Sequence, residues 1–490
     1  MTGRYQRITL ALLLISTVSL LFAALSASQD IEEIVKKTEA YLAEQAARGR
    51  FSGTVLFAKD GVPVFKQAFG LANRSFEVPN RIDTKFNLGS MNKMFTGVSI
   101  AQLAEKGKLS FDDTIGDHVP DYSNSEVAGK VQIHHLLTHT SGLGHYWTDE
   151  YMKTSKDRFR DVEDYLPLFV DQPLLFEPGS EFSYSNAGYM VLGLIVERVS
   201  GQSYFDYVME SVYRPAGMIN TDAYELDYVV PNLAVGYTRA GAREGGLKNN
   251  LFTHVVKGGP AGGGYSTVED LLAFSNALLD NRLLSPEHTE LVFDGKVTRV
   301  DNIKYAYGFS NRIENGHKII GHSGGFQGIN SVLSMYVDLG YTIAVMSNAD
   351  RGAMDVRDFI EEQLIGKSLR TKNREFTHMI LAHIEQNGYD AGVELYGKNP
   401  DNLTVLENMV NQRGYELMGR EKFSGAVDVL RFNVFLYPES ANCYDSLGEA
   451  YMTAGNTELA IWFYEKSVQL APGNTNGIEM LKRLRAGKEQ

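Results

Sequence analysis

Residues 86–100 have the sequence FNLGSMNKMFTGVSI, and this stretch predicts both a helix and a reactive side chain. Residues 91–104 are largely apolar, which suits a buried helix. The helix should end near Gly107, because glycine is a common residue just after the last helical turn. Ser90 then stands at the start of the helix, and Lys93 follows one turn later on the same face.

The pairing of Ser90 with Lys93 indicates covalent catalysis by serine. A serine hydroxyl is a poor nucleophile until a base takes its proton. Burial disfavours the charged form of a lysine, so the pKa of Lys93 should be lowered and its neutral amine can act as that base. The positive end of the helix also favours developing negative charge. Taken alone, the Ser-x-x-Lys pattern is weak evidence, because ordinary composition produces it by chance.

Strand patterns lie on both sides of this helix, far apart in the chain. Residues 53–59 and 62–69 are two apolar, β-rich runs around Asp60-Gly61, which is a strong hairpin signal. Strands at both ends of one domain should join in a single antiparallel sheet covered by the intervening helices, which is an α+β fold. The downstream strands are expected at residues 318–322, 331–337 and 341–346.

From about residue 370 the chain shows helical patterning alone, with an internal repeat of period 34. This period is typical of tetratricopeptide helix pairs, in which small residues lie at a tight helix crossing. Such repeats need neighbours to bury their apolar faces. A groove for a protein partner and a packing module braced on the preceding domain both fit the pattern. The repeated residues are Gly414, Met418, Ala426, Leu436 and Pro438, which recur as Gly448, Met452, Ala460, Leu470 and Pro472.

Composition indicates a globular protein that does not bind nucleic acid. The 490 residues are 43% apolar and 22% charged, which is ordinary for globular chains, and the length suggests two domains. The net charge of −13 argues against nucleic-acid binding, which needs a basic face. The single cysteine, Cys443, leaves no intramolecular disulfide to form, so stability must come from the core.

The N-terminus has the pattern of an export signal, because Arg4 and Arg7 precede a mostly apolar run. We therefore expect residues 1–28 to be a signal peptide and the mature protein to be periplasmic or secreted. The run is also long enough to remain as an uncleaved anchor, and membrane contact is expected only in that case. Residues 29–368 should form the catalytic domain, and residues 369–490 the helical repeat region.

Two further segments follow the Ser-x-x-Lys pattern in order. Residues 177–186, EPGSEFSYSN, place Tyr184 and Asn186 in a Pro-Gly loop before a helical stretch. Residues 321–325, GHSGG, lie between two predicted strands. Together the three segments resemble the motifs of the class C β-lactamases and penicillin-binding proteins. The likeness runs from about residue 34 to residue 364 and includes residues 136–143 (LLTHTSGL) and 260–270 (PAGGGYSTVED).

This resemblance implies a β-lactamase/transpeptidase-like domain, and it implies roles for two more residues. Tyr184 would lie between the nucleophile and the leaving group. With its proton drawn towards Lys93, the tyrosine is a second candidate base and the proton donor to the leaving group. Asn186 would hydrogen-bond both the lysine and a substrate amide.

The third segment is expected to hold the substrate. Glycines at Gly324 and Gly325, beside Ser323, would let the substrate backbone lie against the strand edge. The N–H groups of Gly325 and Ser90 would form an oxyanion hole. His322 stands where the antibiotic-hydrolysing enzymes have lysine, and histidine is mostly neutral at pH 7. This form resembles the esterase and D-aminopeptidase branches of the family and argues against β-lactam hydrolysis.

The sequence therefore predicts a serine hydrolase that forms an acyl-enzyme on Ser90 and acts on a peptide, a D-amino-acid amide or an ester. A β-lactamase or cell-wall D,D-carboxypeptidase is one alternative, and a non-catalytic scaffold whose repeats bind a protein partner is another. We expect no cofactor. His135 and His139 have the spacing of zinc ligands but lack the glutamate of the metalloprotease motif, so we expect no metal and a structural, hydrogen-bonded His139.

Overall fold

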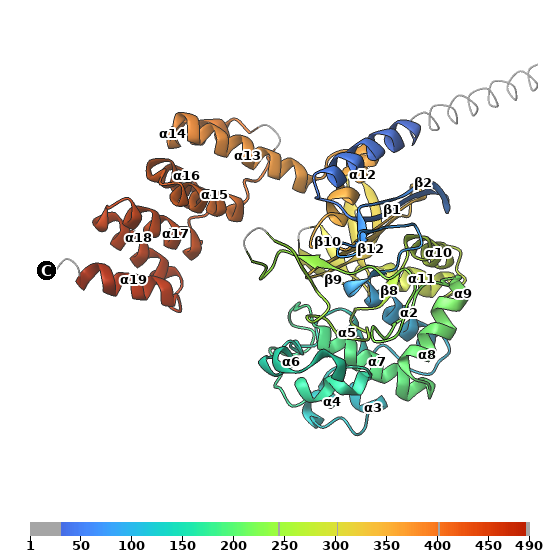
Figure 1. The fold of residues 1–490 in the computed structure, drawn as a ribbon. Coiled ribbons are helices and arrows are strands. Elements are labelled where there is room, and N and C mark those ends of the chain that lie inside the picture. The colour runs from blue at the N-terminus through green and yellow to red at the C-terminus, as the bar shows by residue number, and fades with distance from the viewer. Residues whose placement is uncertain (1–30, 244–245, 301, 400–401, 487–490) are drawn as a thin grey trace, which may run out of the picture. The chain divides into compact units, whose positions relative to one another are not determined.

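The chain divides into two compact units in a computed structural model (Figure 1). The first unit ends at Gly366 and the second begins at Lys367. The predicted export signal lies outside the described residues. Within the described part of the chain, no helix combines the length and apolar character needed to cross a bilayer. The described residues are 31–243, 246–300, 302–399 and 402–486.

One antiparallel sheet organises the first unit (Figure 1). The hairpin predicted around Asp60-Gly61 is confirmed as β1 and β2. β1 also pairs with β14, from Gly53 opposite Ser347 to Lys59 opposite Tyr341, so strands from both ends of the unit do join. The order across the sheet is β2 (Val62–Phe69), β1 (Gly53–Lys59), β14 (Tyr341–Ser347), β13 (Ile329–Tyr336), β12 (His317–Phe326), β11 (Ser310–Glu314), β10 (Ile303–Tyr305) and β9 (Val297–Val300).

Both faces of the sheet are buried, because its central strands are apolar on both sides. In β1, Val55 and Phe57 belong to one core while Leu56 and Ala58 belong to the other, as side chains alternate along a strand. The first core also contains side chains of the N-terminal helical stretch 31–47 and of α12. The second core is larger and contains side chains of α2 (Asn92–Glu105), α7 (Asn186–Ser200) and α10 (Val268–Leu279), of which α2 and α7 carry residues of the candidate site.

The predicted helix cover of the sheet is confirmed. The helices of the first unit are α2 (Asn92–Glu105), α3 (Ile115–His118), α4 (Ser125–Lys130), α5 (Ile133–Leu137), α6 (Asp149–Lys153), α7 (Asn186–Ser200), α8 (Tyr204–Val208), α9 (Arg214–Ala216), α10 (Val268–Leu279), α11 (Pro286–Phe293) and α12 (Ala353–Ile365). Short ladders pair β3 (Leu71–Asn73) with β4 (Val78–Pro79), β5 (Phe86–Asn87) with β8 (Tyr265–Ser266), and β6 (Tyr237–Thr238) with β7 (Lys248–Asn249).

The second unit is helical, and its sequence repeat corresponds to a repeated helix crossing. Gly414 of α15 lies against Leu430 of α16, and 34 residues later Gly448 of α17 lies against the ring of Tyr464 of α18. A methyl group at Gly414 would lie 2.5 Å from Leu430, so the two helices approach closely only because the residue is small. The helices are α13 (Leu369–Asn387), α14 (Tyr389–Gly397), α15 (Glu407–Gly419), α16 (Phe423–Leu436), α17 (Ala441–Thr453), α18 (Thr457–Leu470) and α19 (Thr475–Ala486).

Candidate active site

Ser90 lies on a 3-10 turn, η1 (Gly89–Met91), which connects β5 to α2. The turn packs directly on β12, because Gly89 has a φ of +51° and a methyl group there would lie 2.9 Å from the backbone nitrogen of Gly325. The Gly89 N–H donates a 2.8 Å hydrogen bond to the side-chain oxygen of Asn87. α2 follows immediately, so Ser90 stands at the start of the predicted helix.

Lys93 is completely buried on the first turn of α2. Its Nζ donates to the side-chain oxygen of Asn186 at 2.8 Å and to the carbonyl oxygen of Ala261 at 2.5 Å. Burial holds the pKa of this amine well below its usual value, because the charged form would lose its hydration. A neutral amine has two N–H groups and one lone pair. The two donated hydrogen bonds therefore use both N–H groups and leave the lone pair to accept a proton.

Tyr184 lies two residues before α7, and its phenol interacts with the side chain of Ser90. Burial raises the pKa of its phenol, and this interaction and the charge of Arg299 offset the rise only in part. The Nζ of Lys93 is 4.8 Å from the centroid of the Tyr184 ring. Burial therefore disfavours the charged form of both the phenol and the amine.

His139 fixes the segment that carries Tyr184. Its backbone carbonyl accepts from the Ser183 N–H at 2.9 Å, and its Nδ1 accepts from the Ser185 N–H at 3.1 Å. Its ring packs on the Tyr184 ring with 4.1 Å between centroids. His139 has a φ of +60°, which is strained for a residue other than glycine. Three contacts on consecutive residues thus hold the tyrosine in place, in line with the structural role expected for this histidine.

Residues His322 to Gly325 lie on β12 at a free strand edge. β12 pairs with β11 only as far as Gly321, whereas its pairing with β13 continues to Phe326. A methyl group at Gly324 would lie 1.9 Å from the carbonyl oxygen of Leu88, so this part of β12 touches the backbone just before Ser90. The strand edge and the serine are therefore held together by backbone contact.

His322 is buried and has a hydrogen-bond partner at each ring nitrogen. Its Nδ1 donates to the carbonyl oxygen of Ser323 at 2.6 Å, and the Tyr305 hydroxyl lies 2.9 Å from its Nε2. Since Nδ1 carries the proton, the Tyr305 hydroxyl is the donor to Nε2. Burial lowers the pKa of His322 to about 3. The imidazole is therefore neutral and offers a substrate no positive charge.

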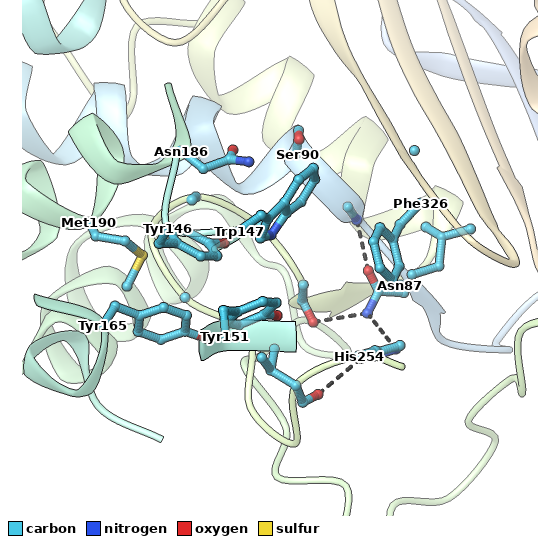
Figure 2. Close-up of a pocket in the computed structure, with 18 residues that line it drawn as sticks. Asn87, Ser90, Tyr146, Trp147, Tyr151, Tyr165, Asn186, Met190, His254 and Phe326 are labelled. Carbon is cyan, nitrogen blue, oxygen red and sulfur yellow. Dashed lines mark hydrogen bonds between the residues drawn. The ribbon is translucent and has the colours of Figure 1, made fainter. Parts of the chain in front are cut away.

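A cleft opens beside Ser90 (Figure 2). Ser90, Asn186 and Gly325 line it, so three of the residues singled out from sequence meet at one surface. The glycine-rich segment from Gly259 to Gly263 forms another wall, and it also supplies the Ala261 carbonyl that holds Lys93.

The β-lactamase family model matches residues 33–367. The chain belongs to the β-lactamase family. A penicillin-binding protein of Bacillus subtilis strain 168 is 30% identical over 315 residues, which cover 61% of this chain and 69% of that protein. The solved structure of a penicillin-binding protein from Bacillus halodurans is 34% identical, with a TM-score of 0.60, and the match covers 68% of this chain and 98% of that one. D-amino acid amidase from Ochrobactrum anthropi SV3 shares the fold, at 22% identity and a TM-score of 0.57, over 68% and 98% of the two chains.

As a β-lactamase-family member, the chain is a serine hydrolase. The family match ends within one residue of the first unit's end, so the helical unit lies outside the matched region.

Two residues of the site were missed by sequence reasoning. Arg299 on β9 places its guanidinium 5.8 Å from the centroid of the Tyr184 ring, and nothing in the polar stretch around it indicates a site. Asn87 supports the turn before Ser90. An asparagine two residues before the N–H that it binds is a common turn signal, so this residue could have been found from sequence.

Proposed function

We propose that the enzyme hydrolyses a peptide, a D-amino-acid amide or an ester through an acyl-enzyme on Ser90, with Lys93 and Tyr184 as the base pair. One observation carries the proposal: a fully buried lysine, whose charged form burial disfavours, stands next to a tyrosine whose phenol interacts with the serine side chain. This arrangement supplies the base that a serine hydroxyl needs.

In the first half-reaction, Ser90 Oγ attacks the substrate carbonyl carbon and forms a C–O bond. The Oγ proton passes to the Tyr184 oxygen as the phenol proton passes to Lys93, so the amine becomes an ammonium and no free phenolate is needed. The N–H groups of Ser90 and Gly325 hold the oxyanion. Collapse of the tetrahedral intermediate breaks the bond to the leaving group, which receives its proton through Tyr184. Water then attacks the ester by the same route and releases the acid and the free serine.

The free edge of β12 is the proposed backbone-binding surface. Ser323, Gly324 and Gly325 would contact an extended substrate there, and the Asn186 amide would bind a substrate amide while it orients Lys93. Because His322 is neutral and bonded within the protein, we assign it to the support of this strand and not to the capture of a carboxylate.

Arg299 favours a second candidate function, a β-lactamase or cell-wall D,D-carboxypeptidase. Such enzymes act on substrates that carry a carboxylate near the scissile bond. The exposed guanidinium near Tyr184, on the leaving-group side, could hold that carboxylate in place of the neutral His322. Export of the protein and partner binding by the helical repeats remain predictions from the sequence.

Intact-mass spectrometry tests the proposal. Wild type and Ser90→Ala are incubated with a fluorophosphonate and, in parallel, with a penicillin. We expect a fluorophosphonate adduct on the wild type alone. A long-lived penicillin adduct on the wild type would favour the carboxypeptidase function. Equal ester turnover by both proteins, or the absence of any adduct, would refute the assignment of Ser90.

A further inference from the structure

The cleft beside Ser90 has aromatic walls (Figure 2). The space between its walls amounts to about 630 Å³, part of which is open solvent. Trp147 is half-exposed at the rim, with its ring centroid 5.9 Å from that of Phe326. The large lining side chains are Tyr146, Trp147, Tyr151, Tyr165, Met190 and Phe326.

The cleft offers nothing to compensate a charge. Among the described residues that line it, none is a lysine, arginine, aspartate or glutamate. Burial raises the pKa of Tyr151 to about 12 and lowers the pKa of His254, so both side chains are neutral at pH 7. The amino group of Lys156 lies 4.2 Å from the centroid of the Tyr151 ring, so a cation already lies next to this wall and would repel a second one.

The position of the cleft identifies which half of a substrate it would hold. Ser90 and Gly325, the proposed oxyanion donors, both line it. Tyr184, the proposed proton donor to the leaving group, is not among the described lining residues. The cleft therefore extends from the serine on the side away from the leaving group, which is the acyl side.

Building on the acyl-enzyme proposed above, we propose that this cleft is an acyl subsite that selects uncharged apolar acyl groups, both aromatic and alkyl, and rejects acyl groups with a free ammonium. Burying apolar surface against these rings is favourable, whereas an ammonium would lose its hydration without gaining a carboxylate partner. The preferred substrates are then simple or N-acylated esters and amides, and not the free aminoacyl amides that an aminopeptidase uses.

Two pairs of p-nitrophenyl esters test the subsite. The 3,3-dimethylbutanoate and trimethylammonioacetate esters match in size and shape and differ in charge, while phenylacetate and acetate differ in the ring. Each kcat/KM is divided by the spontaneous hydrolysis rate of that ester. We expect the neutral member of the first pair and the phenyl member of the second to be favoured by at least about tenfold.

Trp147→Ala should lower the phenylacetate-to-acetate ratio by roughly tenfold, since the side chain forms the rim. Phe76→Ala, which removes an aromatic side chain that is 79% exposed and outside the cleft, should leave the ratio unchanged. Preference for the cationic ester would overturn the proposal in favour of a cation-binding aromatic site, and equal rates within both pairs would overturn it outright. Fluorophosphonate labelling of the same samples separates the two proposals: labelled but unselective enzyme refutes only the subsite, whereas absent labelling refutes the acyl-enzyme.

Discussion

Replacing Lys93 with methionine should abolish catalysis and stabilise the fold. The side chain has no exposed surface, so the folded protein must keep the amine uncharged at a pH where the unfolded chain protonates it. Every unit by which the folded-state pKa lies below the unfolded one costs about 1.4 kcal/mol at neutral pH. Methionine keeps the apolar stem and removes this cost, but it leaves the Asn186 and Ala261 oxygens without their donor, at about 1 kcal/mol each.

The balance favours Lys93→Met, and we expect its free energy of unfolding to exceed that of the wild type by about 1–3 kcal/mol at pH 7. Because the folded-state pKa is depressed, the unfolded chain binds more protons than the native one, and wild-type stability rises with pH until the unfolded lysine is also neutral. The advantage of the variant should therefore shrink between pH 7 and pH 10. The buried tyrosines also make stability depend on pH, but they are present in both proteins. Their contribution therefore cancels in the difference between the two free energies of unfolding.

Calorimetry of the full chain measures the free energy of unfolding. Because the chain has two units, the unfolding transition of the catalytic unit is identified as the one that shifts when the wild type is labelled with a fluorophosphonate. Lys153→Met, at an exposed position on α6, is a control for loss of a lysine and should change neither stability nor its pH dependence. A difference between Lys93→Met and wild type that stays constant from pH 7 to pH 10, or a variant less stable at every pH, would show that the amine is charged in the folded protein and would refute the reasoning.

Three further substitutions test the surroundings of the site. Gly324→Ala should lower kcat at least about 100-fold with an unchanged circular dichroism spectrum, because the new methyl group displaces the turn that carries Ser90. A normal kcat would mean that the backbone at Leu88 can move away without displacing Ser90. His139→Asn retains an acceptor for the Ser185 N–H and tolerates a positive φ, so its kcat should exceed that of His139→Leu by at least about tenfold at similar KM; equal kcat values would exclude the positioning role. Glu361→Gln removes the nearer of the two carboxylates that pair with the buried Arg312 and leaves it only Glu314 at 3.5 Å, so it should lower the free energy of unfolding by about 3 kcal/mol in urea titrations, while fluorophosphonate labelling stays complete; unchanged stability would mean that Glu314 alone compensates the arginine.

Sequence patterns predicted the central sheet and the position of Ser90 at the start of a helix, because local signals carry both. The hairpin at residues 53–69 has two apolar runs around Asp-Gly, and β13 and β14 are largely apolar. The last three strands, from Val297 to Glu314, were not predicted, because they lie at the sheet edge and their exposed residues show no clear alternation. Arg299 was missed for the same reason.

Long-range contacts account for the rest of what was missed in the site. The i, i+3 spacing predicts that Lys93 and Ser90 share a helix face, but it does not show that the amine is held by Asn186 and Ala261, which belong to two other segments. The LLTHTSGL segment likewise gives no sign that His139 packs on Tyr184. Such partners become visible only when the chain is folded.

The contact between Gly89 and β12 holds Ser90 and the proposed oxyanion donor Gly325 at a fixed separation, and this contact involves backbone atoms only. A change of side-chain rotamer cannot alter a contact between backbone atoms. Even the smallest substitution, glycine to alanine, adds a methyl group for which there is no space. Selection for new substrates therefore has to act elsewhere, on the aromatic walls and on the strand edge. A mutational library that keeps Gly89 and varies Trp147, Met190 and Phe326 would change substrate specificity without altering the geometry of the catalytic residues.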